Sequence, residues 1–400
     1  MGLISVDDAL RAICSGAARL PEVLEDVGAC DGLVLAANLH ARRNQPPFAA
    51  SSMDGYAVRR ANVENLPTEL AVVGEAAAGR GWAGTLTDGQ AVRIFTGAPV
   101  PAGADAIVIQ ENTKRSGDTI VVTSGTVDAG HIRPLGFDFT EGDHLLDAGI
   151  RLAPRTLTLA AAMGYATLSV VQKPKIAIIA TGDELVLPGA PTGPDQIVCS
   201  NPFGVAAIAN RAGGIATVLG IARDTEADLN AMLDRADDAD IVVTIGGASV
   251  GDHDLVGPVL RSRGVALDFW KVAMRPGKPL MFGRAQNRTY LGLPGNPVSS
   301  LVCSRVFLVP LIHAMLGLSD IESAPQVLPL SAPIEANGPR THYMRAVTEH
   351  HGGALRVRPV NSQDSSLLTR LAQADALIVR SPNAPAAALG EAVSVLPLDF

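Results

Sequence analysis

The sequence predicts a multidomain protein that combines a central, mostly parallel α/β domain with two β-rich parts. An N-terminal β-rich lobe on a helical segment precedes this domain, and a C-terminal β barrel follows it. The chain has 400 residues, enough for roughly two to four domains. Between about 175 and 317, apolar strand-like runs alternate with helix-like segments, as in a parallel sheet covered on both faces. On either side, short β-like runs are separated by Gly and Pro, which indicates β domains.

The first element is an amphipathic helix over 5–15, because Ser5 is followed by acids in the first turn. We assign it to an elongated helical and mixed segment made of residues 1–45 and 140–172. Residues 152–171 of that segment are rich in Ala, Leu and Thr, and we expect them to be helical. The β-rich lobe is expected over 46–139, with strands at 70–76, 91–97, 106–111 and 119–124.

The α/β domain is expected over 173–320. Its predicted strands cover 175–180, 216–222, 240–245, 265–274 and 289–293, and its predicted helices include 201–212, 225–237 and 298–317. The barrel is expected over 325–400, where β-like runs return between Pro and Gly breaks.

Composition and charge exclude several classes of protein. Hydrophobic residues make up 47% of the chain, so a large core is available, and the net charge of −8 disfavours binding to nucleic acid. No apolar run reaches the ~18 residues of a membrane helix, and acids stand near the N-terminus where a signal peptide has bases. The four cysteines form no C-x-x-C pair, which favours free thiols. We therefore expect a cytoplasmic protein that binds no membrane.

Polar and glycine-rich clusters follow the predicted strands of the α/β domain at the point where each strand ends. The clusters are TGDE at 181–184, RD at 223–224, GGASVGDHD at 246–254, RPGKP at 275–279 and PGNP at 294–297. Ligands of open α/β sheets bind at the carboxyl ends of the strands. The sequence therefore predicts a binding site at this edge.

The residue types in these clusters point to phosphate groups and a hard metal ion. The backbone of Gly246, Gly247, Ser249 and Gly251 is able to form a nest of N–H groups for an oxyanion. Positive charge comes from Lys271, Arg275 and Lys278, and carboxylates from Asp183, Glu184, Asp224, Asp252 and Asp254. Carboxylates without His or Cys favour Mg²⁺ over zinc. The alternative is that some carboxylates cap helices, with Asp183 and Asp252 the best candidates.

Other motifs are weaker. The G-x-G-x-x-G string at 79–84 is not followed by a helix, so we interpret it as a loop and not as a dinucleotide site. In the lobe, Asp54 lies in a turn, and the polar loops 96–99 and 133–138 are further candidates. These loops would face the α/β edge either within the chain or across a dimer.

Seven strings occur in an order that resembles one family. They are SSMDGYAV (51–58), RIFTGAPVPAGADAIVIQE (93–111), IRPLGFD (132–138), IATGDEL (179–185), GGASVGDHD (246–254), FWKVAMRPGKP (269–279) and LGLPGNPVSS (291–300). They are similar to the molybdopterin molybdenumtransferase family, MoeA in bacteria and the E domain of gephyrin. The resemblance covers essentially the whole chain.

The resemblance implies a four-domain chain and a homodimer, with an active cleft between the α/β domain of one subunit and the lobe of the other. It implies an enzyme that inserts molybdate into adenylylated molybdopterin and releases AMP, with Mg²⁺ as cofactor. The partners it implies include the molybdopterin adenylyltransferase and the proteins that accept the finished cofactor.

The resemblance also implies site residues. In the lobe these are Asp54, Thr96, Arg133 and Asp138, and in the α/β domain Glu184, Asp224, Asp254, Lys271 and Arg275. Pro294 and Pro297 match a loop that shapes the pocket, and Ser365 matches a serine of the last domain. Our hypothesis is that Lys271, Arg275, Lys278 and the backbone of 246–251 hold phosphate and molybdate. Glu184, with Asp54 or Asp138, would hold Mg²⁺ or orient the attacking oxyanion.

This chain departs from the family pattern at three places. Arg275 replaces a lysine, Phe137 stands where an acid is common, and Thr369-Arg370 stand where paired serines are frequent. These departures leave open a tungstate-preferring paralogue. Further alternatives are a non-catalytic carrier or scaffold of the same fold, a molybdopterin adenylyltransferase, and a nucleotide-binding domain of another kind.

Overall fold

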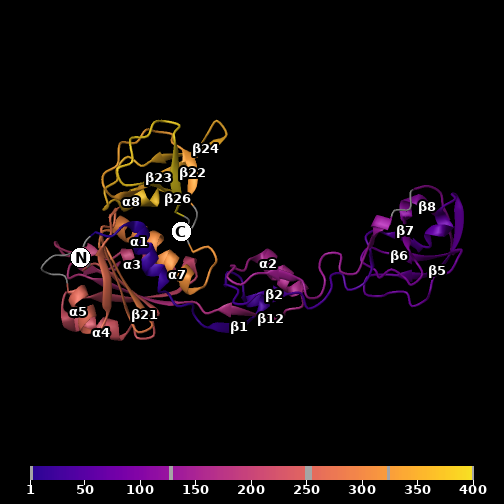
Figure 1. Ribbon diagram of the computed structural model, residues 1–400, viewed down its shortest axis with the longest axis horizontal. Coiled ribbons are helices and arrows are strands. Elements are labelled where there is room, and N and C mark those ends of the chain that lie inside the picture. The colour runs from indigo at the N-terminus through magenta and orange to yellow at the C-terminus, as the bar shows by residue number, and fades with distance from the viewer. Residues whose placement is uncertain (1–2, 126–128, 248–254, 322–324, 399–400) are drawn as a thin grey trace.

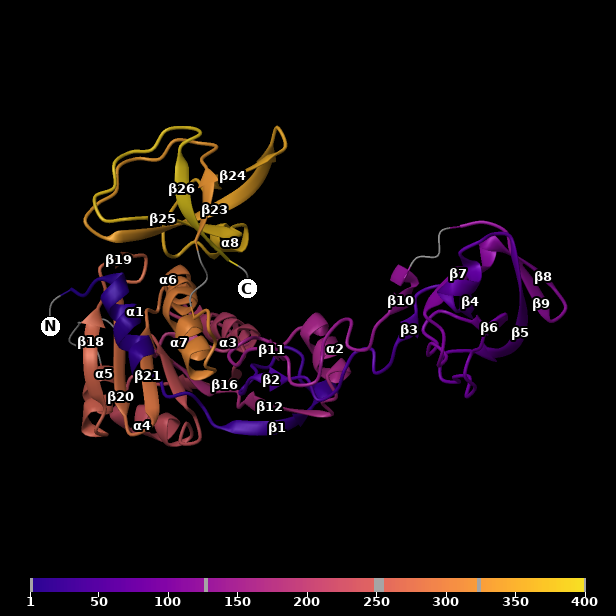
Figure 2. The same ribbon diagram turned by 45° about the vertical axis from the view of Figure 1, so that its right-hand side comes forward.

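The computed structural model describes residues 3–125, 129–247, 255–321 and 325–398. The chain is elongated (Figure 1): an α/β domain with a β domain stacked on it forms one end, and a separate β lobe forms the other. Between them lies a small mixed segment, and two chain segments run from it to the lobe (Figure 2). This arrangement puts the lobe far from the α/β domain of its own chain.

The α/β domain is built on a six-stranded sheet of order β16-β13-β17-β21-β20-β18. The strands are β13 (Lys175–Thr181), β16 (Ile215–Ala222), β17 (Ile241–Ile245), β18 (Ala266–Lys271), β20 (Pro279–Ala285) and β21 (Arg288–Leu293). The pairs β13–β16, β13–β17 and β17–β21 are parallel, whereas β20 is antiparallel to both of its neighbours. The expected mostly parallel sheet is confirmed, and strand β20 is an addition.

Helices cover both faces of this sheet. They are α3 (Asn201–Ala212), α4 (Glu226–Asp234), α5 (Val256–Ser262) and a continuous helix made of α6 (Pro297–Cys303), the π-helical turn η5 (Ser304–Leu308) and α7 (Val309–Met315). By length and composition, the helix Pro297–Met315 is apolar enough to cross a membrane, but 83% of it is buried inside the protein. Its apolar character is that of a core helix, which packs on β21 and beside α3, with α1 against α7.

The first helix, α1 (Val6–Ser15), begins as its sequence predicts: the Ser5 side chain accepts a hydrogen bond from the Asp8 N–H at 3.1 Å. Its apolar stripe, however, packs into the α/β core, where Val6, Ala9 and Ile13 are buried. Assigning residues 1–45 as a whole to the elongated segment was therefore wrong for this helix. An apolar stripe needs a large apolar surface, and the long helix through α7 supplies it.

The mixed segment contains two antiparallel ladders and one helix. Strand β1 (Glu22–Asp26) pairs with β12 (Thr167–Val171), β2 (Leu39–His40) pairs with β11 (His144–Leu146), and α2 covers Pro154–Ala162. The expected helix over 152–171 was therefore wrong in its second half. Gly164, at φ +98°, ends the helix, and the run TLSVV continues as a strand because its β-branched residues pack well on a sheet.

The lobe is a six-stranded sheet of order β7-β4-β6-β5-β9-β8. Its strands are β4 (Gly55–Val58), β5 (Thr68–Ala76), β6 (Gln90–Ile94), β7 (Ala106–Ile109), β8 (Thr113–Ser116) and β9 (Thr119–Val122). Strands β3 (Ala50–Ser51) and β10 (Ile132–Arg133) pair at its base, and a bridge joins Gln45 to Phe139 further along the connection. The lobe is thus carried on two antiparallel chain segments.

The last domain is a curled sheet of order β19-β23-β25-β26-β22, and β24 pairs with β23 along the same edge as β19. Its elements are β19 (Met274–Arg275), β22 (Gln326–Pro329), β23 (Thr341–His351), β24 (Ala354–Pro359), α8 (Leu368–Ala372), β25 (Ala376–Arg380) and β26 (Ala392–Pro397). A single bridge between Leu330 and Val357 joins its two ends, so it is barrel-like. Because β19 comes from the α/β domain, this sheet ties the two domains together.

Candidate functional site

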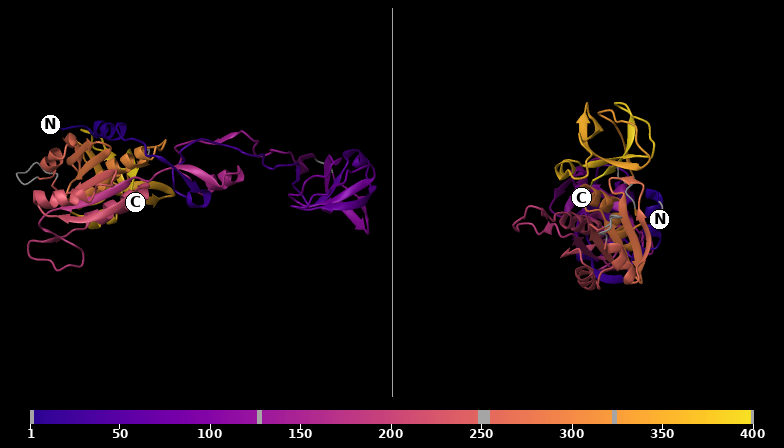
Figure 3. Two further views of the ribbon diagram at one scale, coloured as in Figure 1. Left: turned by 90° about the horizontal axis from the view of Figure 1, so that it is seen from below. Right: turned by 90° about the vertical axis from the view of Figure 1, so that its left-hand side faces the viewer.

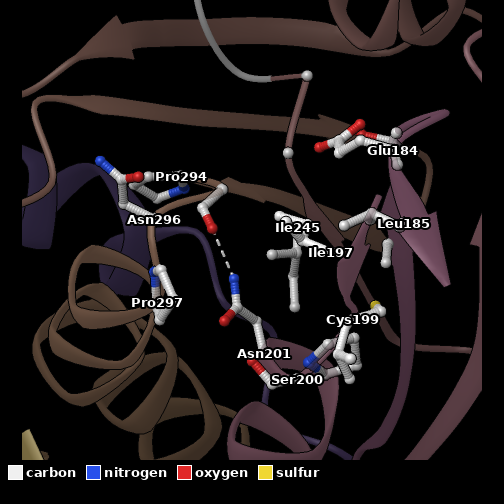
Figure 4. A pocket seen from close by; sticks show the side chains of 18 of the residues that line it. Glu184, Leu185, Ile197, Cys199, Ser200, Asn201, Ile245, Pro294, Asn296 and Pro297 are labelled. Atoms are coloured by element: carbon white, nitrogen blue, oxygen red, sulfur yellow. Dashed lines mark hydrogen bonds between the residues drawn. The ribbon is translucent and has the colours of Figure 1, made fainter. Parts of the chain in front are cut away.

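A cavity of about 740 Å³ opens at the carboxyl ends of the parallel strands (Figure 4). Its wall is formed by residues that follow β13, β16, β17 and β21, by the start of α3 and by the short parallel strands β14 (Leu185–Val186) and β15 (Ile197–Val198). This volume is in the range that holds a ligand of nucleotide size. The sheet edge that the sequence predicted as a binding site therefore contains a cavity.

The turn after β17 explains how the strands approach so closely at this edge. Gly246 and Gly247 have φ angles of +97° and +57°, and a Cβ on Gly246 would lie 2.6 Å from the backbone oxygen of Thr181. A side chain there would push β17 away from β13, so the position requires glycine. Both glycines line the cavity. The other expected nest residues, Ser249 and Gly251, and the carboxylate of Asp254 lie outside the described residues.

Two helices begin at the cavity wall, and neither has a side-chain cap at its first turn. Ser200 precedes α3, Asn296 precedes α6, and neither side chain accepts a hydrogen bond from its helix. The Asn201 side chain donates to the Gly295 carbonyl oxygen at 2.7 Å, which fixes the two helix starts relative to each other (Figure 4). The N–H groups at the start of α3 and the positive ends of the two helix dipoles make this wall attractive to anions, whereas at α6 Pro297 has no N–H group and the Val298 N–H donates to Ser365.

Two of the expected carboxylates, Glu184 and Asp224, line the cavity. The carboxylates of Asp183 and Asp224 each accept a hydrogen bond from the backbone N–H of the other residue. The Asp183 N–H donates to Asp224 at 3.4 Å, and the Asp224 N–H donates to Asp183 at 3.2 Å. Among the residues described, the Glu184 carboxylate has no hydrogen bond or ion pair. Glu184 therefore keeps its oxygens available for a ligand, whereas Asp183 has a structural role.

Thr181 and Cys199 also line the cavity: Thr181 belongs to the predicted TGDE cluster but was not singled out, and Cys199 was missed from the sequence. The Thr181 hydroxyl is buried and has no hydrogen-bond partner among the described residues, and it lies beside the Gly246-Gly247 turn. The Cys199 thiol is 5% exposed, and its pKa is raised by burial and, less strongly, by the nearby charge of Glu184. Membership of that cluster was the signal for Thr181, whereas Cys199 stands only two residues before the helix predicted at 201–212.

The expected basic residues lie at the same edge of the sheet, but they are not among the residues that line the 740 Å³ cavity. Lys271 ends β18, and Arg275 and Lys278 lie between β18 and β20, whose first residue, Pro279, lines the cavity. Lys278 is exposed, and Arg275 lines a different, smaller cavity.

Pro294 and Pro297, from the loop before α6, line the cavity as expected. The C-terminal domain also reaches the cavity, through Ser366. Ser365 contacts the same loop, because its hydroxyl accepts a hydrogen bond from the Asn296 side chain at 3.1 Å and its carbonyl accepts one from the Val298 N–H at 3.2 Å. The last domain therefore holds the loop that begins α6.

The four candidate residues of the lobe are exposed and lie at the other end of the chain (Figures 1 and 3). Thr96 contacts Asp54, whereas Arg133 lies in β10 and Asp138 in the connection to the lobe. Within one chain these residues are not brought together with Glu184. In the described part of the chain, no group of three or more His, Cys, Asp or Glu residues is close enough to hold a metal ion.

Comparisons with known proteins agree with this architecture. Three family models match: the MoeA N-terminal region (domains I and II) at 4–164, a probable molybdopterin-binding domain at 177–314, and the MoeA C-terminal region (domain IV) at 327–398. A MoeA protein of Pyrococcus horikoshii has a similar structure, with a TM-score of 0.85 at 28% identity over 100% of both chains.

Two curated relatives are similar over most of their length. Molybdopterin molybdenumtransferase 2 of Mycobacterium tuberculosis is 38% identical over 334 residues, which are 81% of this chain and 82% of that protein. The molybdopterin molybdenumtransferase of Bacillus subtilis is 34% identical over 98% of this chain and 94% of its own. The ordered motifs, the three-part architecture and these relatives lead to one conclusion. The chain belongs to the molybdopterin molybdenumtransferase family, a family of transferases.

Proposed function

We propose that this protein inserts molybdate into adenylylated molybdopterin and releases AMP. The observation that carries the proposal is the cavity at the sheet edge, which combines two uncapped helix starts with the free carboxylate of Glu184. Donors for an anion beside an acceptor for a cation suit a substrate whose phosphates must be held and neutralised.

Different residues of the cavity wall bind the phosphates, the ring system and the molybdate. The N–H groups at the start of α3 and of Gly247 bind the phosphates, and the apolar side chains of Leu185 and Ile197 contact the ring system. Lys271, Arg275 and Lys278 add positive charge at the same edge for the incoming molybdate. No nucleophilic side chain is required, because positioning and charge neutralisation promote cleavage of a phosphoanhydride.

The donor set at this edge fits Mg²⁺, which prefers carboxylate oxygens and keeps several waters or phosphate oxygens. Glu184 would hold the ion, together with Asp54 or Asp138 of a second copy of the chain. When bound, Mg²⁺ neutralises charge on the phosphate groups. Asp224 stays beside Glu184 and orients the turn that carries it, through its contacts with Asp183.

We further propose a homodimer in which the lobe of one chain covers the cavity of the other. Two exposed apolar patches support this arrangement. One is in the lobe and its connection, where Phe137 is 65% exposed and Phe48, Met53 and Leu135 are exposed as well. The other lies beside the cavity and is formed by Leu187, Ile197, Val198 and Phe203. Burying both in one interface would remove a large apolar area from water.

The free thiols of the chain suit a reducing compartment, so we place the reaction in the cytoplasm. There, the substrate would come from a molybdopterin adenylyltransferase, and the product would pass to cofactor-accepting proteins.

The direct test measures AMP released from adenylylated molybdopterin, with and without molybdate and Mg²⁺. We expect release that needs both ions and that falls at least ~100-fold in Glu184→Ala. The matched control is Glu226→Gln, which removes a carboxylate at the same sheet edge but outside the cavity wall. Binding of substrate without AMP release would disprove the transferase. Replacing molybdate with tungstate in the same assay measures anion preference.

The dimer is tested by mixing two inactive variants, Asp54→Ala and Glu184→Ala, under conditions that exchange subunits. If the site spans two chains, each mixed dimer contains one intact site, and the mixture regains about a quarter of the wild-type activity. If all site residues act within one chain, the mixture stays inactive, and the dimeric cleft is wrong.

A further inference from the structure

Arg93, in strand β6 of the lobe, contacts the neighbours of both Asp54 and Thr96. It is half-buried and stands three residues before Thr96 in the sequence. Its register partner in β4 is Tyr56, two residues after Asp54. Register partners on paired strands lie on the same face of a sheet. Arg93 therefore lies beside both chain segments that form the contact between Asp54 and Thr96.

The guanidinium group of Arg93 lies over two aromatic rings. Its Cζ is 5.0 Å from the centre of the Tyr56 ring and 4.8 Å from the centre of the Phe95 ring. Tyr56 is buried, so its ring is a fixed support, and Phe95 directly precedes Thr96. A guanidinium is planar and is attracted to aromatic faces by its charge. Arg93 thus joins the end of β6 to the start of β4.

The same guanidinium donates two hydrogen bonds to residues that neighbour Asp54. Nη1 donates to the Gly55 carbonyl oxygen at 3.2 Å, and Nη2 donates to the Gln110 side-chain oxygen at 2.7 Å. Gly55 directly follows Asp54, and the Gln110 backbone N–H donates to the Asp54 carbonyl oxygen at 3.1 Å. Arg93 therefore holds two of the residues that fix the backbone of Asp54.

The charge of Arg93 has no ion-pair partner among the residues that the structure describes. Its register partner in β5 is Glu75, but the Glu75 carboxylate pairs with Arg80 at 3.2 Å. Partly burying a cation without a counter-charge costs free energy, which its hydrogen bonds and ring contacts offset. These contacts all lie around the turn that carries Asp54.

We propose that Arg93 is a positioning residue, which fixes the direction of the Asp54 carboxylate by holding Gly55, Gln110 and the end of β6 around it. One carboxylate oxygen then stays with Thr96, while the other, which accepts no hydrogen bond from the described residues, is available to a ligand. The inference rests on the proposed function in one respect, namely that Asp54 takes part in the reaction. It adds to that function a residue that acts through Asp54 and touches no substrate.

The direct test is the backbone amide signal of Thr96 in NMR spectra of the full-length protein without substrate. This N–H donates to a carboxylate, a strong hydrogen bond that moves the amide proton signal downfield. Arg93→Met should move the signal back upfield, because the Asp54 carboxylate is no longer held beside the Thr96 N–H. Arg93→Lys keeps the charge but not the fork of donors, so it should restore the signal in part.

The matched control is Arg59→Met, which removes a partly exposed arginine at the opposite end of β4. Arg59 pairs with Asp88 and contacts none of the residues around Asp54. We expect Arg59→Met to leave the Thr96 amide signal at its wild-type position. A Thr96 signal that is equally unchanged in Arg93→Met would overturn the proposal.

Kinetics of AMP release separate positioning from a general loss of structure. Arg93→Met should lower kcat by about 10- to 100-fold and change KM less than ~3-fold, because the α/β cavity and not Arg93 binds the substrate. Arg93→Lys should recover part of kcat, and Arg59→Met should keep all of it. Thermal unfolding checks that the variants are folded, and Arg93→Lys, which disturbs the packing least, carries the same test if Arg93→Met unfolds.

A wild-type kcat in folded Arg93→Met, with or without a higher KM, would overturn the proposal. Failure of the proposed function is a different result. If the wild-type protein releases no AMP, the transferase reaction is wrong, whereas the Thr96 amide signal still decides whether Arg93 positions Asp54.

Discussion

Thr96 donates two hydrogen bonds to the same oxygen of Asp54, one from its backbone N–H and one from its hydroxyl, each 2.8 Å long. The two residues are far apart in sequence and are brought together by β4 and β6, which pair in the sheet. These hydrogen bonds lower the pKa of Asp54, the backbone bond more than the hydroxyl bond, and the charge of Arg93 contributes least. Asp54 is thus held ionised and in a defined orientation.

Thr96→Val should raise the pKa of Asp54 toward its ordinary value, because the hydroxyl donor is lost while the backbone donor remains. The measurement is an NMR titration of the Asp54 carboxyl carbon. Thr113→Val is the control, since that hydroxyl donates to a backbone carbonyl and not to an acid. An unchanged pKa in Thr96→Val would show that the hydroxyl does not stabilise the carboxylate.

Gly246→Ala should destabilise the α/β domain through both backbone strain and contact with the Thr181 carbonyl. Gly264→Ala separates the two effects: Gly264 also has a positive φ, of +81°, but nothing lies within 4 Å of its would-be Cβ. The control should cost roughly 1–2 kcal/mol of unfolding free energy, and Gly246→Ala clearly more. Denaturant unfolding followed by fluorescence measures both, and equal costs would argue against the close approach of β17 to β13.

Thr181→Val should leave stability unchanged or raise it by about 1 kcal/mol, because the hydroxyl has no partner among the described residues. We expect the same variant to bind adenylylated molybdopterin more weakly, since Thr181 lines the cavity and its hydroxyl lies beside the Gly246-Gly247 turn. Thr244→Val is the matched control. The buried Thr244 hydroxyl also has no hydrogen-bond partner among the described residues, but Thr244 is not among the residues that line the cavity. If both variants bind substrate equally well, Thr181 has no role in binding.

Arg345 is 1% exposed, and its guanidinium donates to the carbonyl oxygens of Leu367, Ser362 and Asp364 at 2.9–3.0 Å. These hydrogen bonds hold the loop that brings Ser365 to Asn296. Arg345→Met should destabilise the C-terminal domain by roughly 3–5 kcal/mol and expose the loop to proteolysis. Arg345→Lys should not rescue it, because an ammonium group cannot span three acceptors as a guanidinium does.

Arg358→Met is the control for this prediction, since that side chain is partly exposed and pairs with Glu349 at the surface. Limited proteolysis followed by mass spectrometry locates any new cleavage. Cleavage at the same rate in both variants would show that Arg345 does not anchor the loop.

The pKa of His342 makes stability depend on pH. The folded protein protonates this ring at about 4, whereas an unfolded chain protonates it near 6.5, so between these values the unfolded state binds the extra proton. Stability from this group is therefore complete above about pH 6.5 and is lost as pH falls toward 4, by up to roughly 3 kcal/mol. The charges of Arg275, Arg340 and Arg345 each oppose its protonation, though less than burial does.

His342→Gln should flatten the fall in melting temperature between pH 6.5 and pH 4. His350→Gln, at an exposed position of the same strand, should leave the pH profile of the wild type unchanged. An unaltered profile in His342→Gln would mean that this ring does not resist protonation.

Local patterns predicted most of the α/β domain, because each of its parallel strands is an apolar run that ends at a polar cluster. Strand β20 was missed. It pairs with β21 through the turn Gln286-Asn287, where Gln286 has a φ of +53°, and no glycine marks that turn. Strand β20 could therefore be recognised only from its pairing with β21 in the structure. In the same way, the sequence did not show which domain the first helix packs on, because that depends on the surface that its apolar stripe contacts.

The sequence by itself determined which residues follow each strand, and so the edge at which Glu184, Asp224 and the two glycines would gather. The tertiary structure decided which of them share a wall. It brought Ser365 to Asn296, put Arg275 beside His342 and Arg380 rather than in the larger cavity, and held Asp54 away from Glu184 of its own chain. The physical reason is that strand order and register bring together residues from distant parts of the chain, and these follow from packing of the whole molecule, which no short segment encodes.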